Sequence, residues 1–588
     1  MSARELITEH LDLWTGAVTK KSSSGRGSNG KVELTGVKKL RELILELAVR
    51  GRLVHQDQNE EPAALLAEKI ATEKAELMQA GAIRKSPKLP QISPDEIPFD
   101  IPNGWHWIRL GELVKKIGSG ATPRGGKNAY VQSGIPFLRS QNIWNDGLNL
   151  QDVAYIPPET HERMANTHVF PNDILLNITG ASLGRCTVVP TELEMANVSQ
   201  HVTIIRTIDP LNRSYLHYLI LSPYVQSLVW GRQVGMAREG LSKKVLEQFE
   251  IPLPPLEEQH RIVQKVDELM ALCDRLEQQT SDQLEAHETL VDTLLGTLTQ
   301  SENATELADN WAHLAAHFDT LFTTEQSIDK LKQTILQLAV MGRLVEQHIT
   351  DTTPSALIDN IAHEREELVG SGKIRKPKIP ASMDLQTSPP FHVPRNWNWA
   401  RLGELFAVVT DGDHQAPPKS EEGVPFLVIG NLNAGHIDFV GCKHVEENYY
   451  LKLDWSRKPA NGDLLYTVTG SYGIPIKVLT SKAFCVQRHV AILRATVSTP
   501  RDYAKLVLES EYGQSYADEI ATGIAQKTVP LTGLRKMPVP LPPEEEQHRI
   551  VQKVDELMAL CDQLKERLNQ ASETRCQLAE AVVEGALN

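Results

Sequence analysis

The sequence lacks the features of a membrane-anchored, secreted or disulfide-stabilised protein. No run of about 18 apolar residues occurs, so we expect no membrane-spanning helix. The first ten residues contain no apolar core, and we therefore expect no secretory signal. The six cysteines include no CxxC pair, which predicts reduced thiols in a cytoplasmic protein and argues against a zinc site.

Motifs for catalysis or cofactor binding are also missing. The segment GRGSNGK (25–31) satisfies GxxxxGK, but Val32 follows where a phosphate-binding loop needs Ser or Thr, and no buried strand precedes it. No GxGxxG opens a helix after a strand, and neither [DN]PP[FY] nor HExxH occurs. We therefore expect no catalytic residue, no metal ligand and no cofactor in this chain. We interpret the protein as a non-enzyme.

Negative charge is in excess, but it is unevenly distributed. The net charge is −14. Residues 103–255 carry +2 and residues 396–543 carry 0, whereas residues 256–300 carry −7 and residues 544–588 carry −5. The two remaining segments, 1–102 and 301–395, carry net charges of 0 and −4. A basic binding face on the two neutral segments therefore remains possible, so nucleic acid is not excluded as a ligand.

An internal repeat dominates the sequence. Residues 258–274 and 546–562 both read EQHRIVQKVDELMALCD, and each stretch follows a PLPP. Six further segments repeat in the same order with offsets of 288–292, one of them NDILLNITGASLG (172–184) with GDLLYTVTGSYG (462–473). They include KKLRELILELAVRGRLV with DKLKQTILQLAVMGRLV, AIRKSPKLP with KIRKPKIP, NGWHWIRLGEL with NWNWARLGEL, GIPFLRSQNI with GVPFLVIGNL, and HVTIIR with HVAILR. The chain is thus one module written twice.

Each copy contains a helical segment, a Lys/Pro-rich linker, a β-rich globular segment and a long closing helix. The predicted fold class is α+β, with two mixed, β-rich domains separated by long antiparallel coiled-coil helices and related by pseudo-two-fold symmetry. The closing helices have apolar residues at heptad spacing, among them Leu290, Leu294, Ala571, Leu578 and Val582. The predicted boundaries are 1–36 (extension and flexible linker), 37–102, 103–255, 256–300, 301–395, 396–543 and 544–588.

Polar side chains on Gly-bearing loops are candidate DNA contacts in both globular segments. Arg and Lys suit guanine edges, Asn and Gln suit adenine edges, and Ser and Thr suit phosphates. The competing interpretation is an ordinary surface turn, and His201 and His489 are expected to be packed. The candidates are Thr122, Arg124, Lys127, Arg139, Ser140, Gln141, Asn142, Thr179 and Ser182 in the first copy, and Asp411, His414, Gln415, Lys419, Asn431, Thr469 and Ser471 in the second.

The closing helices match far better than the globular segments do. Identity at positions that we expect to be exposed indicates one partner bound twice, whereas diverged globular segments indicate two different targets. Two half-sites on duplex DNA suit such a molecule. The candidate partner-binding residues are Gln259, His260, Arg261, Gln264, Gln547, His548, Arg549 and Gln552.

The chain resembles the specificity subunits of type I restriction–modification systems over nearly its whole length. The resemblance rests on PLPPLEEQHRIVQKVDELMALCDRL (252–276) and its twin from 540, on the GRLV helix ends, and on the GSGATPRGG and DGDHQAPP segments. It implies two target recognition domains that read a bipartite, asymmetric DNA site and helices that set the spacer. It also implies two modification (methyltransferase) subunits and two restriction (translocase/nuclease) subunits. Adenine methylation and ATP-dependent restriction, with S-adenosylmethionine, ATP and Mg, would belong to those partners.

Two alternatives remain open at this point. A single-chain enzyme would need a cofactor motif that the sequence does not show. A coiled-coil scaffold that recruits proteins would not bind DNA, and the salt dependence of DNA affinity separates it from a specificity subunit. About 100 residues precede the first globular segment, and we hypothesise that residues 1–36 dock on a modification subunit.

Overall fold

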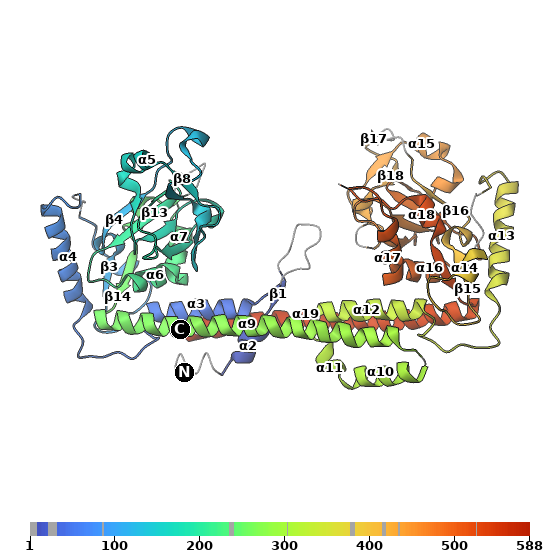
Figure 1. Ribbon diagram of the computed structural model, residues 1–588, viewed down its shortest axis with the longest axis horizontal. Helices are drawn as coiled ribbons and strands as arrows, with labels where there is room; N and C mark the ends of the chain where they lie inside the picture. The colour runs from blue at the N-terminus through green and yellow to red at the C-terminus, as the bar shows by residue number, and fades with distance from the viewer. Residues whose placement is uncertain are drawn as a thin grey trace. The chain divides into compact units, whose positions relative to one another are not determined.

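The computed structural model describes residues 9–20, 32–84, 88–233, 240–302, 304–376, 383–413, 419–432, 435–524 and 526–587. The chain divides into two compact units: unit 1 comprises residues 1–283 and 571–588, and unit 2 comprises residues 284–570 (Figure 1). Two long helices, α9 (Leu256–Gln300) and α19 (Glu544–Leu587), each begin in one unit and end in the other. The segment 25–31 and most of the predicted linker lie outside the described residues.

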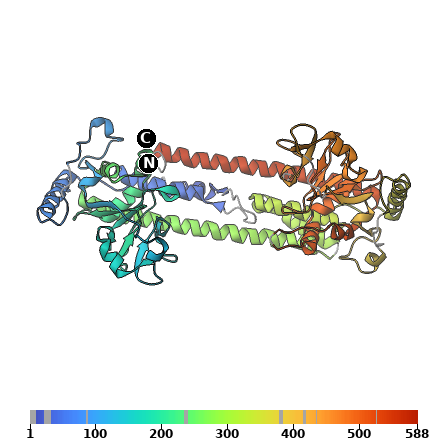
Figure 2. The same cartoon turned by 90° about the horizontal axis from the view of Figure 1, so that it is seen from above.

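The base of unit 1 is a three-helix layer in which α3 (Thr35–Val49) lies between the first part of α9 and the last part of α19 (Figure 2). Arg41 near the start of α3 donates to Asp274 at 2.7 Å, and Gln56, beyond the end of α3, donates to Glu258 at the start of α9. The helix α3 therefore runs antiparallel to α9. Lys39 pairs with Glu580 and Arg50 donates to the Leu587 carbonyl, so α3 runs parallel to α19.

The base of unit 2 repeats this layer with the roles of the long helices exchanged. Here α12 (Glu325–Val340) runs parallel to α9, because Lys330 pairs with Asp292 and Arg343 donates to the Ser301 carbonyl. Lys332 of α12 pairs with Asp562 near the middle of α19, and Gln347, which follows the end of α12, donates to Glu546 at the start of α19. The helix α12 therefore runs antiparallel to α19. The long helices are therefore antiparallel in both units, which confirms the predicted fold class.

The sheet domain of unit 1 combines two four-stranded sheets with a two-stranded ribbon. The first sheet is antiparallel, with the order β11-β10-β13-β4, and the second has the order β8-β5-β12-β9 with β5 and β12 parallel. The ribbon β14-β3 leads directly into α9. The strands are β3 (His106–Arg109), β4 (Val114–Ser119), β5 (Ile135–Leu138), β8 (Ala154–Ile156), β9 (His168–Val169), β10 (Ile174–Asn177), β11 (Cys186–Val188), β12 (Ala196–Val198), β13 (Val202–Thr207) and β14 (Glu250–Leu253).

The sheet domain of unit 2 has the same topology apart from one edge strand and one short hairpin. The hairpin pairs β6 (Ile143–Trp144) with β7 (Gly147–Leu148) in unit 1 and has no counterpart among the described residues of unit 2. The sheets of unit 2 have the orders β16-β23-β20-β21 and β17-β19-β18-β22, with β18 and β22 parallel, and the ribbon is β15-β24. The edge strand β17 pairs with β19, whereas unit 1 has β9 on the opposite edge. The strands are β15 (Asn398–Arg401), β16 (Val408–Asp411), β17 (Lys419–Ser420), β18 (Val424–Leu427), β19 (Lys443–Val445), β20 (Leu464–Thr467), β21 (Pro475–Lys477), β22 (Cys485–Val486), β23 (Val490–Arg494) and β24 (Pro538–Leu541).

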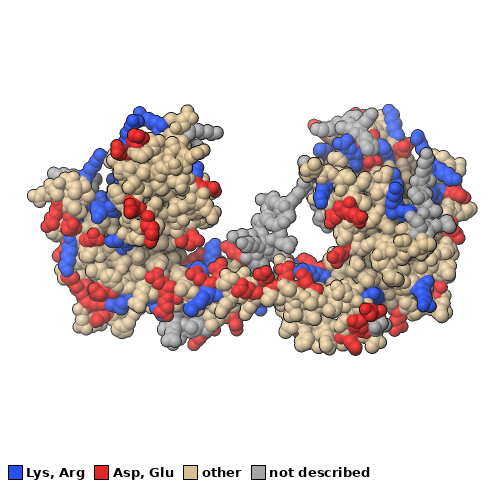
Figure 3. Space-filling model, viewed as in Figure 1, with Lys and Arg blue, Asp and Glu red and all other residues tan. Residues whose placement is uncertain are grey.

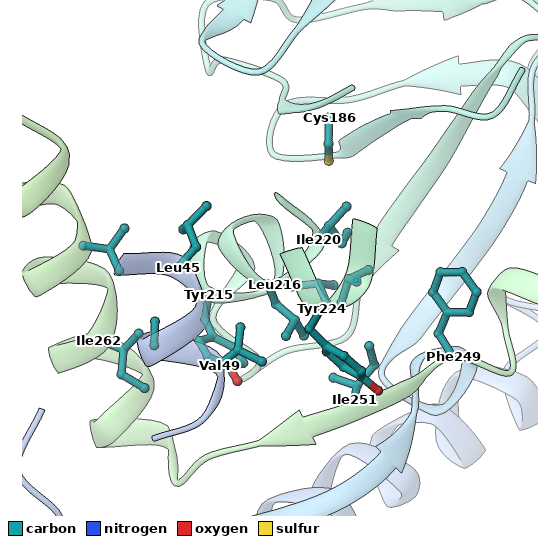
Figure 4. Packing of buried hydrophobic residues seen from close by; sticks show 14 of the residues in the cluster. Leu45, Val49, Cys186, Tyr215, Leu216, Ile220, Tyr224, Phe249, Ile251 and Ile262 are labelled. Atoms are coloured by element: carbon teal, nitrogen blue, oxygen red, sulfur yellow. The ribbon is translucent and has the colours of Figure 1, made fainter. Parts of the chain in front are cut away.

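Two short helices seat each sheet domain on its helical base. In unit 1, α6 (Arg213–Leu221) and α7 (Pro223–Gly231) pack on α3, and Figure 4 shows Leu45 and Val49 of α3 near Tyr215. The backbone N–H of Tyr224 donates to the buried carboxylate of Glu46 at 3.1 Å. In unit 2, α16 (Arg501–Glu509) and α17 (Glu511–Ile520) contact α12 in the same way, with Gln337 at the position of Glu46.

The start of each long helix carries a buried glutamate that ties three repeated motifs together. In unit 1, Glu258 accepts from the Trp105 indole at 2.9 Å and from the Gln56 amide at 2.6 Å. Trp105 in turn packs on Gly51, where φ is +68° and a Cβ would lie 2.4 Å from Pro102. The GRLV helix end, the NGW segment and the EEQ segment therefore meet at one point. We call this cluster the junction of unit 1.

The junction of unit 2 repeats these contacts. Glu546 accepts from the Trp397 indole at 3.0 Å and from Gln347 at 2.6 Å, and Gly342 has φ +71° beside Trp397. Burial raises the pKa of both Glu258 and Glu546, and the donated hydrogen bonds partly offset that effect. Each carboxylate is stabilised only while its donors stay in place.

The apolar seam of the long helices departs from the predicted heptads in their second halves. Leu290 and Leu578 are exposed by 49% and 52%, and Ala571 is also exposed, so these assignments are wrong. The residues one position later, Val291 and Ala579, are buried instead. A straight α-helix has 3.6 residues per turn and drifts from a strict seven-residue repeat. The packing partners also change along each helix, from α3 to α12 or the reverse.

Short helices precede the α3 and α12 helices and pack within their own units. In unit 1, α2 (Leu11–Gly16) buries Trp14 completely, and the Val18 carbonyl accepts from the Ser572 hydroxyl of α19 at 2.8 Å. In unit 2, α10 (Ala304–Ala316) and α11 (Phe318–Leu321) precede α12 and bury Leu314 and Leu321. The described part of the N-terminal extension thus contacts its own chain's C-terminal helix. No helix of the described residues is long and apolar enough to cross a membrane.

We predict that Trp105→Phe destabilises unit 1 by about 1–3 kcal/mol, because it removes one donor from a buried carboxylate and part of the ring that packs on Gly51. The free energy of unfolding is measured by chemical denaturation, with a spectroscopic signal that reports on unit 1. Trp230→Phe is the matched control, because Trp230 is 54% exposed and should cost less than about 0.5 kcal/mol. Equal effects of the two substitutions would contradict the role of the junction.

Candidate nucleic-acid interface

In unit 1, a glycine lets one candidate loop leave the sheet close to a second loop. A Cβ on Gly120 would lie 2.0 Å from the Val198 carbonyl oxygen, so no other residue fits there without a shift of the backbone. The Gly120 and Ala121 N–H groups donate to the Val202 and Val198 carbonyls at 2.9 and 3.1 Å. The loop that carries Thr122 and Arg124, both exposed, therefore starts beside the turn between β12 and β13.

Two further loops end at the same turn. The Asn177 amide at the end of β10 donates to the Ser140 carbonyl at 2.9 Å, which places the 3₁₀ turn 140–142 beside β10. The Thr179 hydroxyl lies 2.7 Å from Nδ1 of His201 in the β12–β13 turn. We call the surface formed by these loops the polar rim of unit 1. It comprises Thr122, Arg124, Arg139, Ser140, Gln141, Trp144, Thr179, Ser182, Arg185, Gln200 and His201.

The polar rim includes an arginine–tryptophan stack that the sequence did not reveal. The Arg185 guanidinium lies 3.8 Å from the ring centroid of Trp144, and the Trp144 indole donates to the Gln141 carbonyl at 2.9 Å. Trp144 is 41% exposed. Stacking holds the guanidinium plane in a fixed orientation, with edges that can donate two parallel hydrogen bonds to a base or a phosphate. The two residues lie 41 positions apart in the sequence, which is why periodicity and motif spacing gave no signal.

Most first-copy candidates belong to the polar rim, but Asn142 does not. Asn142 is 2% exposed; its carbonyl accepts from the Arg139 N–H and its amide donates to the Asn149 carbonyl, both at 2.9 Å. Its assignment as a DNA contact is therefore wrong, because both ends of the side chain hold the turn together. Arg139 is half-buried and donates to the Asp152 carbonyl. The Lys127 side chain lies outside the described residues.

In unit 2 the equivalent loops meet around the turn between β22 and β23. Gly412 packs against the Val486 carbonyl, as Gly120 does against Val198. The His489 ring contacts Gln487 at 3.0 Å and Arg488 at 3.2 Å. Burial and the neighbouring guanidinium lower the pKa of His489, so its neutral ring offers one donor and one acceptor. Gln487 and Arg488 are thus candidates that the sequence argument missed.

The second-copy candidates divide into three groups. Asp411, at the end of β16, and Ser471, which is exposed, lie on the loops around this turn. Thr469 is 5% exposed and its hydroxyl faces that of Thr528, so its assignment as a DNA contact is wrong. The Asn431 side chain accepts from the Val428 N–H at 3.0 Å. It thereby holds the turn of unit 2 that is equivalent to the turn held by Asn142 in unit 1. The third group, His414, Gln415 and the Lys419 side chain, lies outside the described residues.

The candidate partner-binding residues also divide by burial. Gln259 and Gln547 are buried and donate to the Pro254 and Pro542 carbonyls at 2.9 and 2.8 Å, so the expectation that Gln259 is exposed is wrong. Arg261 pairs with Glu60, and Arg549 pairs with Asp351 at 2.7 Å. The remaining four, His260, Gln264, His548 and Gln552, are exposed.

Charge follows the division between helices and sheets. Figure 3 shows Asp and Glu gathered along the long helices, with Lys and Arg interspersed over the sheet domains. The described residues contain no group of three or more His, Cys, Asp or Glu side chains that could hold a metal ion. Polar loops on a near-neutral domain are suited to hydrogen bonding with a polyanion's bases and backbone.

The protein-family model described as type I restriction modification DNA specificity domain matches residues 102–286 and 394–573. The chain belongs to this family. It is 37% identical to the specificity subunit of the type I restriction enzyme EcoEI and 36% identical to that of EcoAI, both from Escherichia coli, over the full length of each chain. A solved chain from work on complex assembly in "the type I R-M system" is 19% identical, with 84% of this chain and 99% of that chain covered and a TM-score of 0.47. The family match and the two relatives of 37% and 36% identity make the chain a type I specificity subunit with two DNA recognition domains.

We predict that Arg185→Ala weakens specific DNA binding by about 5- to 150-fold, as expected for loss of one bidentate base contact. The effect should depend on a single base pair in one half-site, which competition with single-base variants of the site measures. Arg213→Ala is the control, because this exposed guanidinium lies 3.7 Å from Asp209. An equal loss on duplexes with and without the site would contradict base reading and indicate a phosphate contact.

Proposed function

We propose that each recognition domain reads one half of a bipartite, asymmetric DNA site, while the helices set the spacer and bind two modification subunits. The uneven divergence of the two copies carries this proposal. The polar rim of unit 1 contains Arg185 stacked on Trp144, whereas unit 2 has Ile474 where Arg185 stands. Different side chains on the same framework predict different half-site sequences.

The exposed positions of the closing helices support a shared partner. His260, Gln264, Asp267 and Ala271 are exposed at spacings of four, three and four residues, which places them on one face of α9. The same four residue types are exposed on α19 at His548, Gln552, Asp555 and Ala559. We call these two faces the shared stripes. The junction contacts account for the identity of Glu258 and Gln259, but they do not account for the identity of the shared stripes.

The chemistry would then belong to the partners. The modification subunits would supply S-adenosylmethionine-dependent adenine methylation, and two restriction subunits would supply ATP- and Mg-dependent translocation and cleavage. This chain would contribute recognition, with no cofactor of its own. Its relatives are named as specificity subunits of type I restriction enzymes, which supports this division of labour.

A map of methylated adenines in cells with and without the gene tests the proposal. We expect one class of sites to disappear with the gene, consisting of two different short sequences separated by a spacer of constant length. Methylated sites that form one continuous sequence, or a palindrome, would contradict two different readers. Methylation by the purified chain alone would instead support a single-chain enzyme.

The spacer is expected to follow the length of the long helices. Seven residues inserted after Gln283 in α9, together with seven after Gln570 in α19, add about 10 Å of helix. Because duplex DNA rises about 3.4 Å per base pair, the methylated sites should gain about three spacer base pairs and keep both half-sites. As a control, seven residues inserted after Ile349, which is fully exposed between α12 and α13 (Pro354–Gly370), should leave the spacer unchanged. Altered half-sites would contradict the role of the helices.

A further inference from the structure

A duplicated basic turn follows the helix that flanks each sheet domain. The turn after α4 (Ala63–Gln79) contains Arg84 and Lys88, and the turn after α13 contains Lys373, Arg375 and Lys376. The sequence from 77 to 94 and that from 368 to 383 contain no acidic residue, whereas the preceding helices α4 and α13 contain three and four. Neither the polar rim nor the shared stripes include these residues.

The two turns have the same backbone structure. Gly81 and Gly372 both have φ +72°, and a Cβ on either would meet nothing within 4 Å, so glycine serves the backbone conformation rather than close packing. The N–H of the residue after each glycine donates to Leu77 and Leu368 carbonyls at 2.9 and 3.0 Å. The chain therefore turns at the same point in both copies and presents Arg84 and Arg375 three residues after the glycine.

Each flanking helix is fixed to its own sheet domain, which holds the basic turn in place. Lys74 of α4 donates to the Gly111 carbonyl, and Arg365 of α13 donates to the Phe406 carbonyl at 2.9 Å. Figure 1 shows α4 beside the sheets of unit 1 and α13 beside those of unit 2. After Lys88, the Pro90 carbonyl accepts from the buried Arg109 at 3.2 Å, so the segment is anchored on both sides of the turn.

The cations of the basic turns are available to a ligand. All five side chains are exposed, and none of them forms an ion pair with another described residue. By contrast, Lys69 of α4 pairs with Glu61 at 2.7 Å and Lys38 lies 3.9 Å from Glu33. Five exposed cations without counter-ions, next to domains that bind DNA, favour a polyanionic ligand.

The composition of the turns favours DNA phosphates over a protein partner. Protein interfaces centre on buried aromatic or aliphatic anchors and are depleted in lysine. Among the described residues of both turns, no large hydrophobic side chain is strongly exposed; Ile374 is 8% exposed and packs inward. A ligand recognised equally by two modules whose base readers differ must also be independent of sequence, as the phosphate backbone is.

We propose that the two basic turns bind backbone phosphates of the DNA without reading its sequence. The proposal rests on the proposed function, since it places a second DNA contact beside each base reader. Arg84 and Lys88 would contact phosphates near the first half-site, and Lys373, Arg375 and Lys376 would contact phosphates near the second. These contacts would add affinity to every DNA sequence equally.

The test uses the full-length chain assembled with its modification subunits, on one duplex that contains the methylated site and one that lacks it. The variants are Arg84→Gln with Lys88→Gln, and Arg375→Gln with Lys376→Gln. We expect each double variant to lose affinity for both duplexes by the same factor, about 3- to 30-fold at physiological salt. The slope of log K against log salt should fall by about 1–2, since each phosphate contact contributes about 0.9.

The control double variant is Lys38→Gln with Lys69→Gln, which removes the same charge from residues that are paired within the chain and should retain the wild-type slope. An unchanged slope in the basic-turn variants would overturn the proposal. A loss of bound modification subunits, with DNA affinity of the remaining complex unchanged, would also overturn it and indicate a protein ligand. If the wild-type complex itself showed no site-dependent binding, the proposed function would fail instead.

Discussion

The carboxylate at the start of each long helix is the constraint on which the rest of the fold depends. Glu258 and Glu546 are 1% and 0% exposed, and a buried charge of this kind is tolerated only if hydrogen-bond donors surround it. The donors come from elements far apart in sequence: an indole at the entry of the sheet domain and an amide beyond the end of the short helix. Because the carboxylate satisfies both, it fixes the angle at which each domain leaves its helices.

This constraint changes how the identical segments are interpreted. Identity over EQHRIVQKVDELMALCD suggests a partner surface at first, but Glu258, Gln259 and Arg261 are already used within the chain. Each makes a contact that its twin repeats, and the apolar positions repeat because the seam does. What remains is the face with His260 and Gln264, on which Asp267 accepts from the Tyr218 hydroxyl in unit 1. Unit 2 has Leu506 at the position of Tyr218, so this contact does not account for the same residue at Asp555. The proposed partner bound twice would account for that face alone.

The sequence predicted the helices, the strands and the order of the motifs, because these follow from hydrophobic period and from the repeat itself. Several candidate residues lie on loops, as predicted, and the structure brings these loops together. Sequence reasoning failed where the outcome depends on tertiary contacts: Asn142 and Thr469 look like surface polar residues, yet their hydrogen bonds hold turns together. The stack of Arg185 on Trp144 depends on two hairpins that meet in the fold. The buried position of α19 is Ala579 and not Leu578, which depends on the helix that lies opposite. Neither feature produces a local pattern in the sequence.

The loops can diverge because their backbone is held without help from the side chains that face outward. In unit 1 the Asn177 N–H donates to the Arg185 carbonyl at 2.8 Å, and the Gln226 amide donates to Gly184 at 2.9 Å. In unit 2 the same bonds join Thr467 to Ile474 at 3.1 Å and Gln514 to Gly473 at 2.6 Å. Arginine in one copy and isoleucine in the other therefore occupy one backbone position at no cost to the turn. A framework that is indifferent to the side chain at this position allows the exposed residues of the loops to change while the junctions and the helices stay the same.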